Sequence, residues 1–331
     1  MSNQTAVSQN TSTTIPEAST GGTMMPLLDV RDLSVSFVQY TGGLQMRFLT
    51  VITSLSLTVR PGEILAVVGS SGSGKSLLAH AILGILPNNA RISGTMLYVN
   101  EDLTPERQMS LRGREIALVP QSVNFLDPLM RVGFQVRSAA HGSEAAKAQR
   151  RVFDRYHLAD QVKGLFPFQL SGGMARRVLV ATATISDARL VIADEPTPGL
   201  HPAVVKETLN HLRELADEDR AVMLITHDIE AALTIADRIA VFYAGTTVEI
   251  ALVADFTDNG EALRHPYSKA LWRALAKNEF VATPGAQPSP DALPPGCLFQ
   301  PNCKIATPEC ASVRPKEREL RGGMVRCIHA A

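Results

Sequence analysis

The chain has 331 residues, of which 45% are hydrophobic, so it can form one large domain or two smaller ones with a sizeable core. Its 32 lysine and arginine residues balance 32 aspartate and glutamate residues, and this zero net charge argues against nucleic acid as a partner. No apolar stretch approaches the ~20 residues that span a bilayer, and no signal-peptide pattern is present, so we expect a globular protein that remains in the cytoplasm.

Residues 1–25 are rich in serine, threonine, asparagine, glutamine and glycine, with almost no large apolar side chains. Such a segment cannot offset the entropy lost on ordering, so we expect a disordered N-terminal tail. Short apolar stretches at 28–30, 33–37 and 51–59 then alternate with polar residues. This alternation is typical of half-buried antiparallel strands.

Four nearly continuous apolar runs follow, at 64–68, 190–193, 221–225 and 239–243. Runs of this kind are typical of strands that are buried on both faces. Amphipathic helical segments lie between several of them, as at 203–216. The predicted fold class is therefore α/β, with a parallel sheet at its core.

The run at 64–68 leads directly into a sequence that fits the phosphate-binding pattern G-x-x-x-x-G-K-S/T. Glycines in this pattern let successive backbone N–H groups turn inward around the phosphates of a nucleotide. We expect Lys75 to reach the β- and γ-phosphate oxygens and the Ser76 hydroxyl to ligate Mg²⁺. The predicted nucleotide-binding residues are Gly69, Ser70, Ser71, Gly72, Ser73, Gly74, Lys75 and Ser76.

Asp194 and Glu195 follow directly after the apolar run at 190–193. An aspartate at the end of a buried strand can hold Mg²⁺ through water, and the adjacent Glu195 is placed to act as the general base that activates water. Acidic pairs after strands are often only solvated loop residues. Because a phosphate-binding loop lies upstream to share the metal, we predict that both carboxylates are functional.

The segment Leu170-Ser-Gly-Gly-Met174 lies between these two sites and resembles the signature sequence of ABC ATPases. Gln121, in Leu-Val-Pro-Gln, is similar to the Q-loop glutamine of that family, and His227, in Ile-Thr-His-Asp, to its switch histidine. All these elements occur in the order that the family requires. The resemblance implies an ABC nucleotide-binding domain over 26–255, with a parallel-sheet core, an antiparallel β subdomain and a helical subdomain at about 122–186.

The resemblance also implies an ATP hydrolase that works as a head-to-tail dimer, with each ATP between the phosphate loop of one subunit and the signature helix of the other. Ser171, Gly172 and Gly173 would present a hydroxyl and backbone N–H groups to the γ-phosphate of the opposite nucleotide. Gln121 would contact Mg²⁺ and connect the nucleotide state to a transmembrane partner, and His227 would contact the γ-phosphate.

An aromatic residue upstream of the phosphate loop normally stacks on adenine in this family. Phe37 is the candidate, Tyr40 and Phe48 are alternatives, and Phe37 fits equally well as a core residue. Two positions depart from the family pattern: Met174 replaces the commoner glutamine of the signature, and His201 replaces the aspartate of the D-loop. Because that aspartate normally communicates between the two sites, His201 favours a heterodimer with one stronger site.

Residues 264–275 are similar to a stretch that follows the nucleotide domain in ATPases of the oligopeptide, dipeptide and nickel importer branch. The resemblance implies the ATP-hydrolysing subunit of a peptide importer, with a nickel or metal-chelator importer as the alternative. A non-transport ABC ATPase of translation or DNA repair is disfavoured, because the chain has neither a second nucleotide domain nor room for a coiled-coil arm.

The partners that this importer family implies are a second ABC ATPase subunit, two transmembrane permease subunits and an extracytoplasmic solute-binding protein. The chain itself would be peripheral, at the cytoplasmic face of the cell membrane. Nothing in this subunit is expected to contact the transported cargo.

All four cysteines lie in a C-terminal extension over 256–331, beyond a proline-rich linker at 283–295. Clustered thiols in a cytosolic chain argue against disulfides and for a metal or cluster. Their separations of five, six and sixteen residues fit zinc poorly, because zinc sites usually contain close C-x₂₋₄-C pairs.

Some members of the importer branch ligate an iron–sulfur cluster with a similar cysteine pattern. The resemblance therefore implies a 4Fe-4S cluster with a structural role, since four thiolates are the right ligand count. Unligated thiols are the alternative. The predicted cluster ligands are Cys297, Cys303, Cys310 and Cys327.

Overall fold

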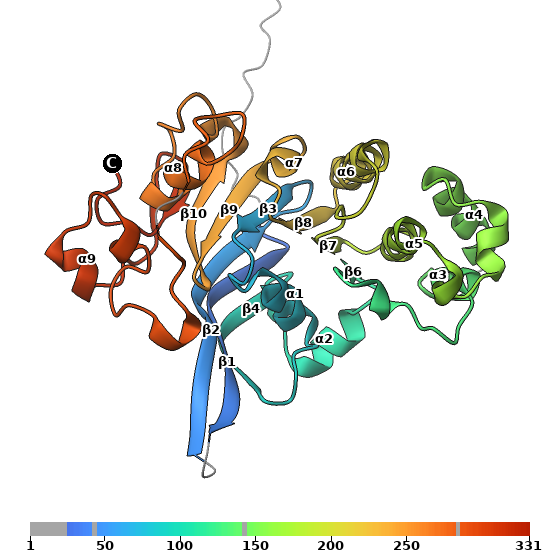
Figure 1. The fold of residues 1–331 in the computed structure, drawn as a ribbon. Helices are drawn as coiled ribbons and strands as arrows, with labels where there is room; N and C mark the ends of the chain where they lie inside the picture. The colour runs from blue at the N-terminus through green and yellow to red at the C-terminus, as the bar shows by residue number, and fades with distance from the viewer. Residues whose placement is uncertain (1–24, 42–44, 141–143, 283–284) are drawn as a thin grey trace, which may run out of the picture.

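The computed structural model describes residues 25–41, 45–140, 144–282 and 285–331. Within them, an eight-stranded sheet forms the centre and a four-stranded antiparallel sheet lies beside it (Figure 1). The predicted disordered tail lies outside the described residues, apart from Met25.

The larger sheet has the strand order β11-β12-β10-β9-β3-β8-β7-β6. The strands from β9 to β6 are parallel to one another, and the pairs from β9 to β11 are antiparallel. The predicted parallel core is thus confirmed, and the four apolar runs form β3, β7, β8 and β9. The strands are β3 (Ile64–Gly69), β6 (Ile116–Val119), β7 (Leu190–Asp194), β8 (Ala221–Thr226), β9 (Arg238–Tyr243), β10 (Thr246–Leu252), β11 (Arg318–Leu320) and β12 (Gly323–Val325).

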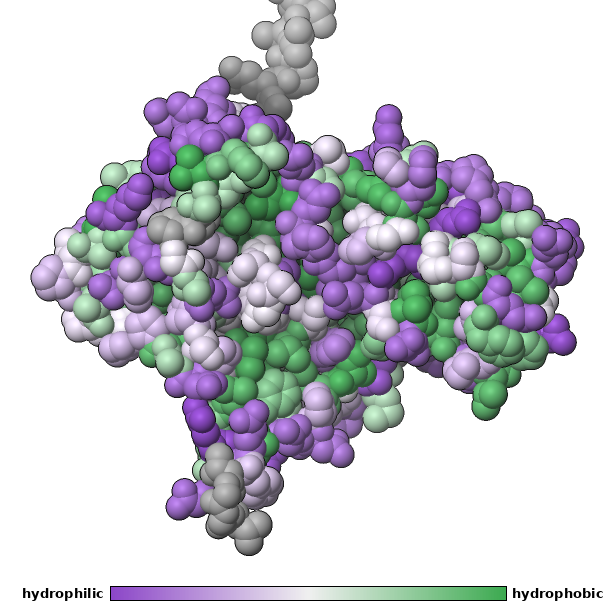
Figure 2. Space-filling view, in the orientation of Figure 1, coloured by the Kyte–Doolittle hydropathy of each residue, from purple (hydrophilic) through white to green (hydrophobic). Residues whose placement is uncertain are grey.

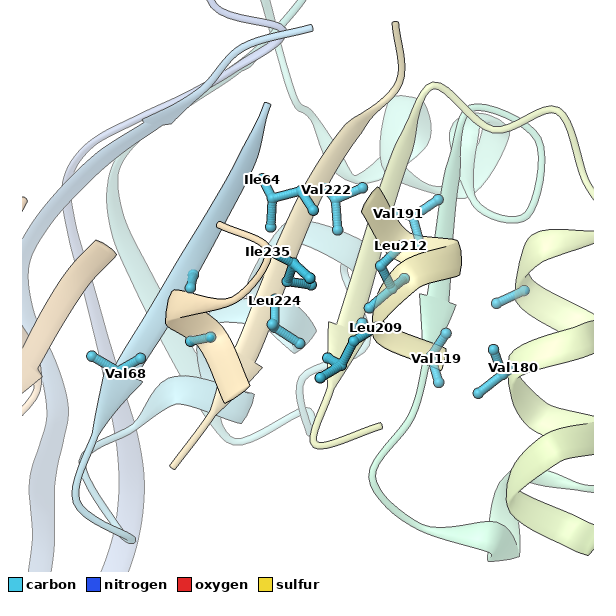
Figure 3. Close-up of a cluster of buried hydrophobic side chains, with 14 of the residues drawn as sticks. Ile64, Val68, Val119, Val180, Val191, Leu209, Leu212, Val222, Leu224 and Ile235 are labelled. Carbon is cyan, nitrogen blue, oxygen red and sulfur yellow. The ribbon is translucent and has the colours of Figure 1, made fainter. Parts of the chain in front are cut away.

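The apolar run of β3 is continuous because its alternate residues enter two different hydrophobic clusters. Ile64 and Val68 pack with residues of α6 (Pro202–Asp217) on one face of the sheet (Figure 3). Leu65 and Val67 pack on the other face with α1 (Lys75–Leu83) and with the smaller sheet. Burial on both faces therefore leaves no polar position in the strand.

The smaller sheet has the order β2-β1-β4-β5, and all of its pairs are antiparallel. Val30, Leu33 and Val35 of β1 are buried, whereas most residues between them are partly or fully exposed. This confirms the half-buried antiparallel strands that the alternating pattern predicts. The strands are β1 (Leu28–Thr41), β2 (Gln45–Val59), β4 (Ala90–Tyr98) and β5 (Glu101–Asp102).

Three helices stand beyond β6 at one end of the molecule: α3, α4 and α5 (Figure 1). Their buried residues belong to the same hydrophobic cluster as β7 and β8, while the subdomain limits given above stay predictions. The predicted helix at 203–216 is confirmed as α6. Along the described stretches, no helix combines the length and apolarity needed to cross a membrane. The other helices are α2 (Pro105–Leu111), α3 (Val132–Ser138), α4 (Ala145–Arg155), α5 (Gly172–Thr184), α7 (Ile229–Leu233), α8 (Pro266–Arg273) and α9 (Pro308–Ser312).

The C-terminal extension continues the central sheet, which the sequence did not predict. β12 pairs with β10 through Glu249 opposite Val325 and Ile250 opposite Met324. β11 then pairs with β12 in a tight hairpin around Arg321, where φ is 49°. Strands of three residues are too short to give a periodic pattern, so only the pairing partner reveals them.

A buried ion-pair network holds this junction together. The Arg264 and Glu249 side chains are 1% and 0% exposed, and Arg264 Nη1 lies 3.3 Å from Glu249 Oε1 and 2.9 Å from Asp255 Oδ2. The remaining guanidinium nitrogens of Arg264 donate to the carbonyl oxygens of Leu320 and Arg321, each at 2.6 Å. All three guanidinium nitrogens of Arg264 therefore have partners, and together they hold the extension against β10.

Replacing Arg264 by methionine should strongly destabilise the chain, because it leaves the buried Glu249 carboxylate without its counter-charge. We expect the free energy of unfolding to fall by about 3–5 kcal/mol, measured by urea unfolding with the fluorescence of Trp272 as the signal. Arg273→Met is the control, since Arg273 forms only an exposed pair with Glu279. Equal urea midpoints for Arg264→Met and Arg273→Met would contradict the stabilising role assigned to the buried Arg264 network.

Candidate nucleotide-binding site

Residues 69–76 form the turn from the carboxyl end of β3 into α1. Gly69 passes so close to β9 that a Cβ atom there would lie 2.5 Å from the Phe242 carbonyl oxygen. Gly74 precedes α1 with a φ of 97°, which glycine adopts without strain. The two glycines thus let the chain turn sharply, so that backbone N–H groups at the start of α1 can face a bound anion.

The Lys75 side chain lies within this turn, where the residue is 7% exposed. Its Nζ donates to the carbonyl oxygens of Gly69, at 2.8 Å, and of Ser70, at 2.9 Å. Burial lowers the pKa of Lys75, and the carboxylates of Glu195 and Asp194 oppose that shift. Phosphate oxygens of a nucleotide can take the place of these carbonyl partners of the ammonium group.

Asp194 ends β7 with 2% of the residue exposed. Burial raises the pKa of Asp194, the nearby Ser76 hydroxyl opposes the shift, and Glu195 adds to it. Its Oδ1 has no hydrogen-bond partner among the residues described. A buried carboxylate oxygen left free beside a serine hydroxyl fits the oxygen ligands that Mg²⁺ prefers.

Glu195 and His227 come together directly beyond β7 and β8. His227 Nδ1 lies 2.8 Å from Oε1 and 2.9 Å from Oε2 of Glu195. The Glu195 N–H donates to the Ile225 carbonyl oxygen at 2.9 Å, and the Glu195 backbone has a φ of 48°. A non-glycine residue in this conformation is strained, so the surrounding structure must hold the Glu195 side chain in place.

Gln121 follows β6 and is exposed, and its predicted contact with Mg²⁺ stays a prediction. The sequence analysis missed its neighbour Arg176, whose Nη1 donates to the carbonyl oxygens of Gln121 and Pro120. Burial lowers the Arg176 pKa, with Glu195 and Asp194 opposing. Arg176, which is half-buried in the first turns of α5, therefore links the Gln121 segment to that helix.

The signature residues lie at the start of α5. The Ser171 hydroxyl accepts a hydrogen bond from the Met174 N–H at 3.3 Å, and α5 begins at Gly172. A Cβ atom on Gly172 or Gly173 would meet nothing within 4 Å, so the backbone here is open to an approaching group. α5 stands apart from α1 in Figure 1.

Phe37 lies on β1, opposite Leu49 of β2 and Ala90 of β4. It is half-buried and packs against the hydrophobic cluster that contains α1, which favours its role as a core residue. Tyr40 and Phe48, the alternatives, are 67% and 58% exposed. Adenine stacking on Phe37 stays a prediction.

The two departures from the family pattern have local roles in the structure. His201 is the N-cap of α6, where its Nδ1 accepts a hydrogen bond from the Ala203 N–H at 3.4 Å. An aspartate would cap the helix in the same way, so His201 keeps this function while removing the charge. Met174 packs against the hydrophobic cluster on the α6 face of the sheet.

All four cysteines line one small cavity, which Phe299 and His329 also border. The Cys297 N–H donates to the Cys310 carbonyl oxygen at 2.8 Å, and all four thiols are free. Burial raises the pKa of the Cys297, Cys303 and Cys327 thiols. Among the described residues, no group of three or more histidine, cysteine, aspartate or glutamate side chains is arranged to hold a metal ion.

Two known families match this chain. Residues 52–198 match the ABC transporter family, and this range includes the phosphate loop, the signature segment and the Asp194–Glu195 pair. Residues 248–310 match the oligopeptide/dipeptide transporter, C-terminal region, which includes α8 and the first three cysteines.

Curated proteins are similar to this chain over most of its length and of theirs. The oligopeptide transport ATP-binding protein OppD of Salmonella typhimurium is 34% identical over 320 residues, covering 91% of this chain and 93% of its own. OppD of Escherichia coli is 35% identical with the same coverage. The dipeptide transport ATP-binding protein DppD of Escherichia coli is 34% identical over 324 residues, covering 92% and 97%.

Solved structures share the fold. The dimeric structure of a bacterial ABC transporter cassette superimposes with a TM-score of 0.60 at 23% identity, over 68% of this chain and 98% of the cassette. An ATP-binding subunit of an ABC transporter gives a TM-score of 0.57 at 25% identity, over 70% of this chain and 91% of that subunit.

Replacing Asp194 by asparagine should weaken Mg²⁺ binding while preserving the shape of the site. We expect the Mg²⁺ concentration that half-saturates binding of a fluorescent ATP analogue to rise by about 10- to 100-fold. Asp187→Asn is the control, because the Asp187 side chain is 98% exposed. An unchanged Mg²⁺ requirement in Asp194→Asn would remove Asp194 from the metal site.

Proposed function

The chain belongs to the ABC transporter ATP-binding proteins, and on this premise we propose that it hydrolyses ATP to power the import of peptides. The observation that carries the proposal is the convergence of Lys75, Asp194 and Glu195 at one edge of the parallel sheet, beside the phosphate loop. The match of residues 248–310 and the peptide transport names of the relatives support peptides as the cargo.

The residues divide the work of hydrolysis among them. The backbone N–H groups of residues 69–76 and the Lys75 ammonium group bind the phosphates. Ser76 and Asp194 would hold Mg²⁺, which neutralises phosphate charge when bound. The Glu195 carboxylate accepts a proton from the attacking water, and His227, in contact with both Glu195 oxygens, fixes the direction of that carboxylate.

A second ATPase subunit is needed to complete the site under this proposal. The donors at Ser171, Gly172 and Gly173 are at the open start of α5, a helix that stands apart from α1 in Figure 1. A helix N-terminus that presents free N–H groups suits the γ-phosphate of a nucleotide held by a partner. His201 in place of an aspartate favours a partner that is a different chain.

An exposed apolar surface supports docking to two transmembrane permease subunits. Figure 2 shows hydrophobic side chains at the surface of the end that carries α3, α4 and α5. Such a patch next to the Gln121 segment marks a protein interface. The permeases would place the chain peripherally at the cytoplasmic face, with a solute-binding protein on the other side. The exposed apolar residues are Phe125, Leu129, Phe134 and Phe168, which are 54%, 87%, 55% and 73% exposed.

Replacing Glu195 by glutamine should stop turnover without preventing ATP binding, because glutamine keeps the shape of the side chain but cannot accept the proton. We expect the hydrolysis rate to fall by about 10²- to 10⁴-fold, measured as phosphate release. Glu218→Gln, at the exposed end of α6, is the control and should hydrolyse ATP normally. Normal hydrolysis by Glu195→Gln would exclude Glu195 as the base.

We further propose that the four cysteines bind a 4Fe-4S cluster. The supporting observation is that the four side chains, although up to 30 positions apart, border one cavity. Four cysteine thiolates are the ligand set of such a cluster, and the absence of a close cysteine pair disfavours zinc. In the part of the chain that the structure describes, no three or more potential ligand side chains are arranged to hold a metal ion. The four thiols must therefore move closer together when the cluster binds. The cluster would then fasten the loops between α8 and β11.

Replacing Cys303 by serine should abolish cluster binding. After anaerobic purification, we expect the unaltered chain to contain about four iron atoms and to absorb broadly in the visible range, and the variant to lose both. Ser312→Ala, in α9 near Cys310, is the control and should keep the iron. A colourless, iron-free unaltered chain would refute the cluster.

A further inference from the structure

The phosphate loop has a direct contact with the C-terminal extension. The Ser70 hydroxyl donates to Gln287 Oε1 at 2.6 Å, across 217 positions of the sequence. Gln287 lies in the proline-rich segment that also borders a small hollow beside Gly72 of the loop. The extension therefore reaches the nucleotide site itself.

A second residue of the extension lies near the same serine. Tyr267, in α8, is 4% exposed; burial raises the pKa of its phenol, and the nearby hydroxyl and backbone N–H of Ser70 oppose that shift. The carbonyl oxygen of Ser70 accepts the hydrogen bond from Lys75 Nζ described above. Gln287 thus holds the residue whose backbone carbonyl also accepts a hydrogen bond from the phosphate-binding lysine.

Asn302 anchors the segment that carries Gln287. Its Nδ2 donates to the carbonyl oxygen of Ala286 at 3.0 Å and lies 3.3 Å from the Tyr243 hydroxyl. Gly285 packs so tightly against this amide that a Cβ atom would lie 1.9 Å from Asn302 Oδ1. Asn302 directly precedes Cys303, which borders the cysteine cavity, so the anchor of Gln287 is next in sequence to a residue of the cavity wall.

An aromatic cluster provides a parallel connection. The ring of Tyr267 lies 4.4 Å from that of Tyr243 and 5.4 Å from that of Phe299, measured between centroids. Phe299 borders the cysteine cavity two positions after Cys297. Packed rings are hard to compress, so a displacement of Phe299 at the cavity wall displaces Tyr267 as well.

We propose that Gln287 is a positioning residue for the phosphate loop, through which the C-terminal extension sets the affinity for ATP. The inference deepens the proposed function and rests on it, since it requires ATP at residues 69–76. A phosphate site depends on donors fixed within about 0.5 Å, and the contact with Gln287 restricts the movement of Ser70. Asn302 joins the segment that carries Gln287 to the residue directly before Cys303.

The test compares ATP affinities in full-length chains that carry Glu195→Gln, so that hydrolysis does not interfere. Gln287→Met keeps the size of the side chain but removes the acceptor for Ser70. We expect the Kd for a fluorescent ATP analogue to rise by roughly two- to tenfold, the range of one hydrogen bond. Asn302→Ala should act in the same direction. Ser289→Ala is the matched control, because this exposed neighbour forms no cap hydrogen bond.

A double-mutant cycle separates positioning from a general loss of stability. With Ser70→Ala already present, Gln287→Met should cost almost nothing further, because the shared hydrogen bond is gone. With Glu195 intact, Gln287→Met should raise KM for ATP and leave kcat nearly unchanged.

Additive effects in the cycle, or an unchanged Kd in Gln287→Met, would overturn the inference and leave the proposed function standing. Failure of every chain to bind ATP would instead overturn both. Thermal unfolding of each variant shows whether a lost affinity for ATP comes from an unfolded chain. If Asn302→Ala and Gln287→Met lose ATP binding because they unfold, the positioning role is wrong.

Discussion

The parallel pairing of β3, β8 and β7 is the constraint on which the site depends. Because the strands run in the same direction, their carboxyl ends meet at one edge, with Val68 opposite Thr226 and Asp194 opposite Ile225. The residues that follow these ends are the phosphate loop, Glu195 and His227. Burial on both faces makes the strands apolar along their whole length, so polar groups are confined to their ends. The chemistry is therefore concentrated where the hydrophobic core stops.

The second feature of the structure is that the extension is fastened at two places with different physical character. Buried charges join Arg264 to β10, where desolvation makes any unpaired partner costly. One exposed hydrogen bond joins Gln287 to the phosphate loop, where a single bond contributes little to stability. The ion pairs of Arg264 hold the extension on the sheet. The hydrogen bond of Gln287 couples the position of the extension to the nucleotide site and is not required for folding.

The sequence predicts what is local. The phosphate loop, the Asp194–Glu195 pair and the buried strands each lie within one short segment, and the structure has the strands where the apolar runs predict them. It could not predict the contact of Gln287 with Ser70 or the pairing of β12 with β10, since these join distant segments through one or two residues. Arg176 was missed for the same reason: its partner is a backbone carbonyl far along the chain. The family resemblance led us to expect the four cysteines close together. That Phe299 borders the same cavity could be found only in three dimensions.

The most direct test of the account is the rate of ATP hydrolysis by the complete membrane complex that a tagged copy of this chain retains, reconstituted in lipid vesicles with its solute-binding protein. The account predicts that peptides, presented by the solute-binding protein, raise the hydrolysis rate and that the peptides accumulate across the membrane. Recovery of the chain without membrane subunits, or a hydrolysis rate that no peptide changes, would contradict it.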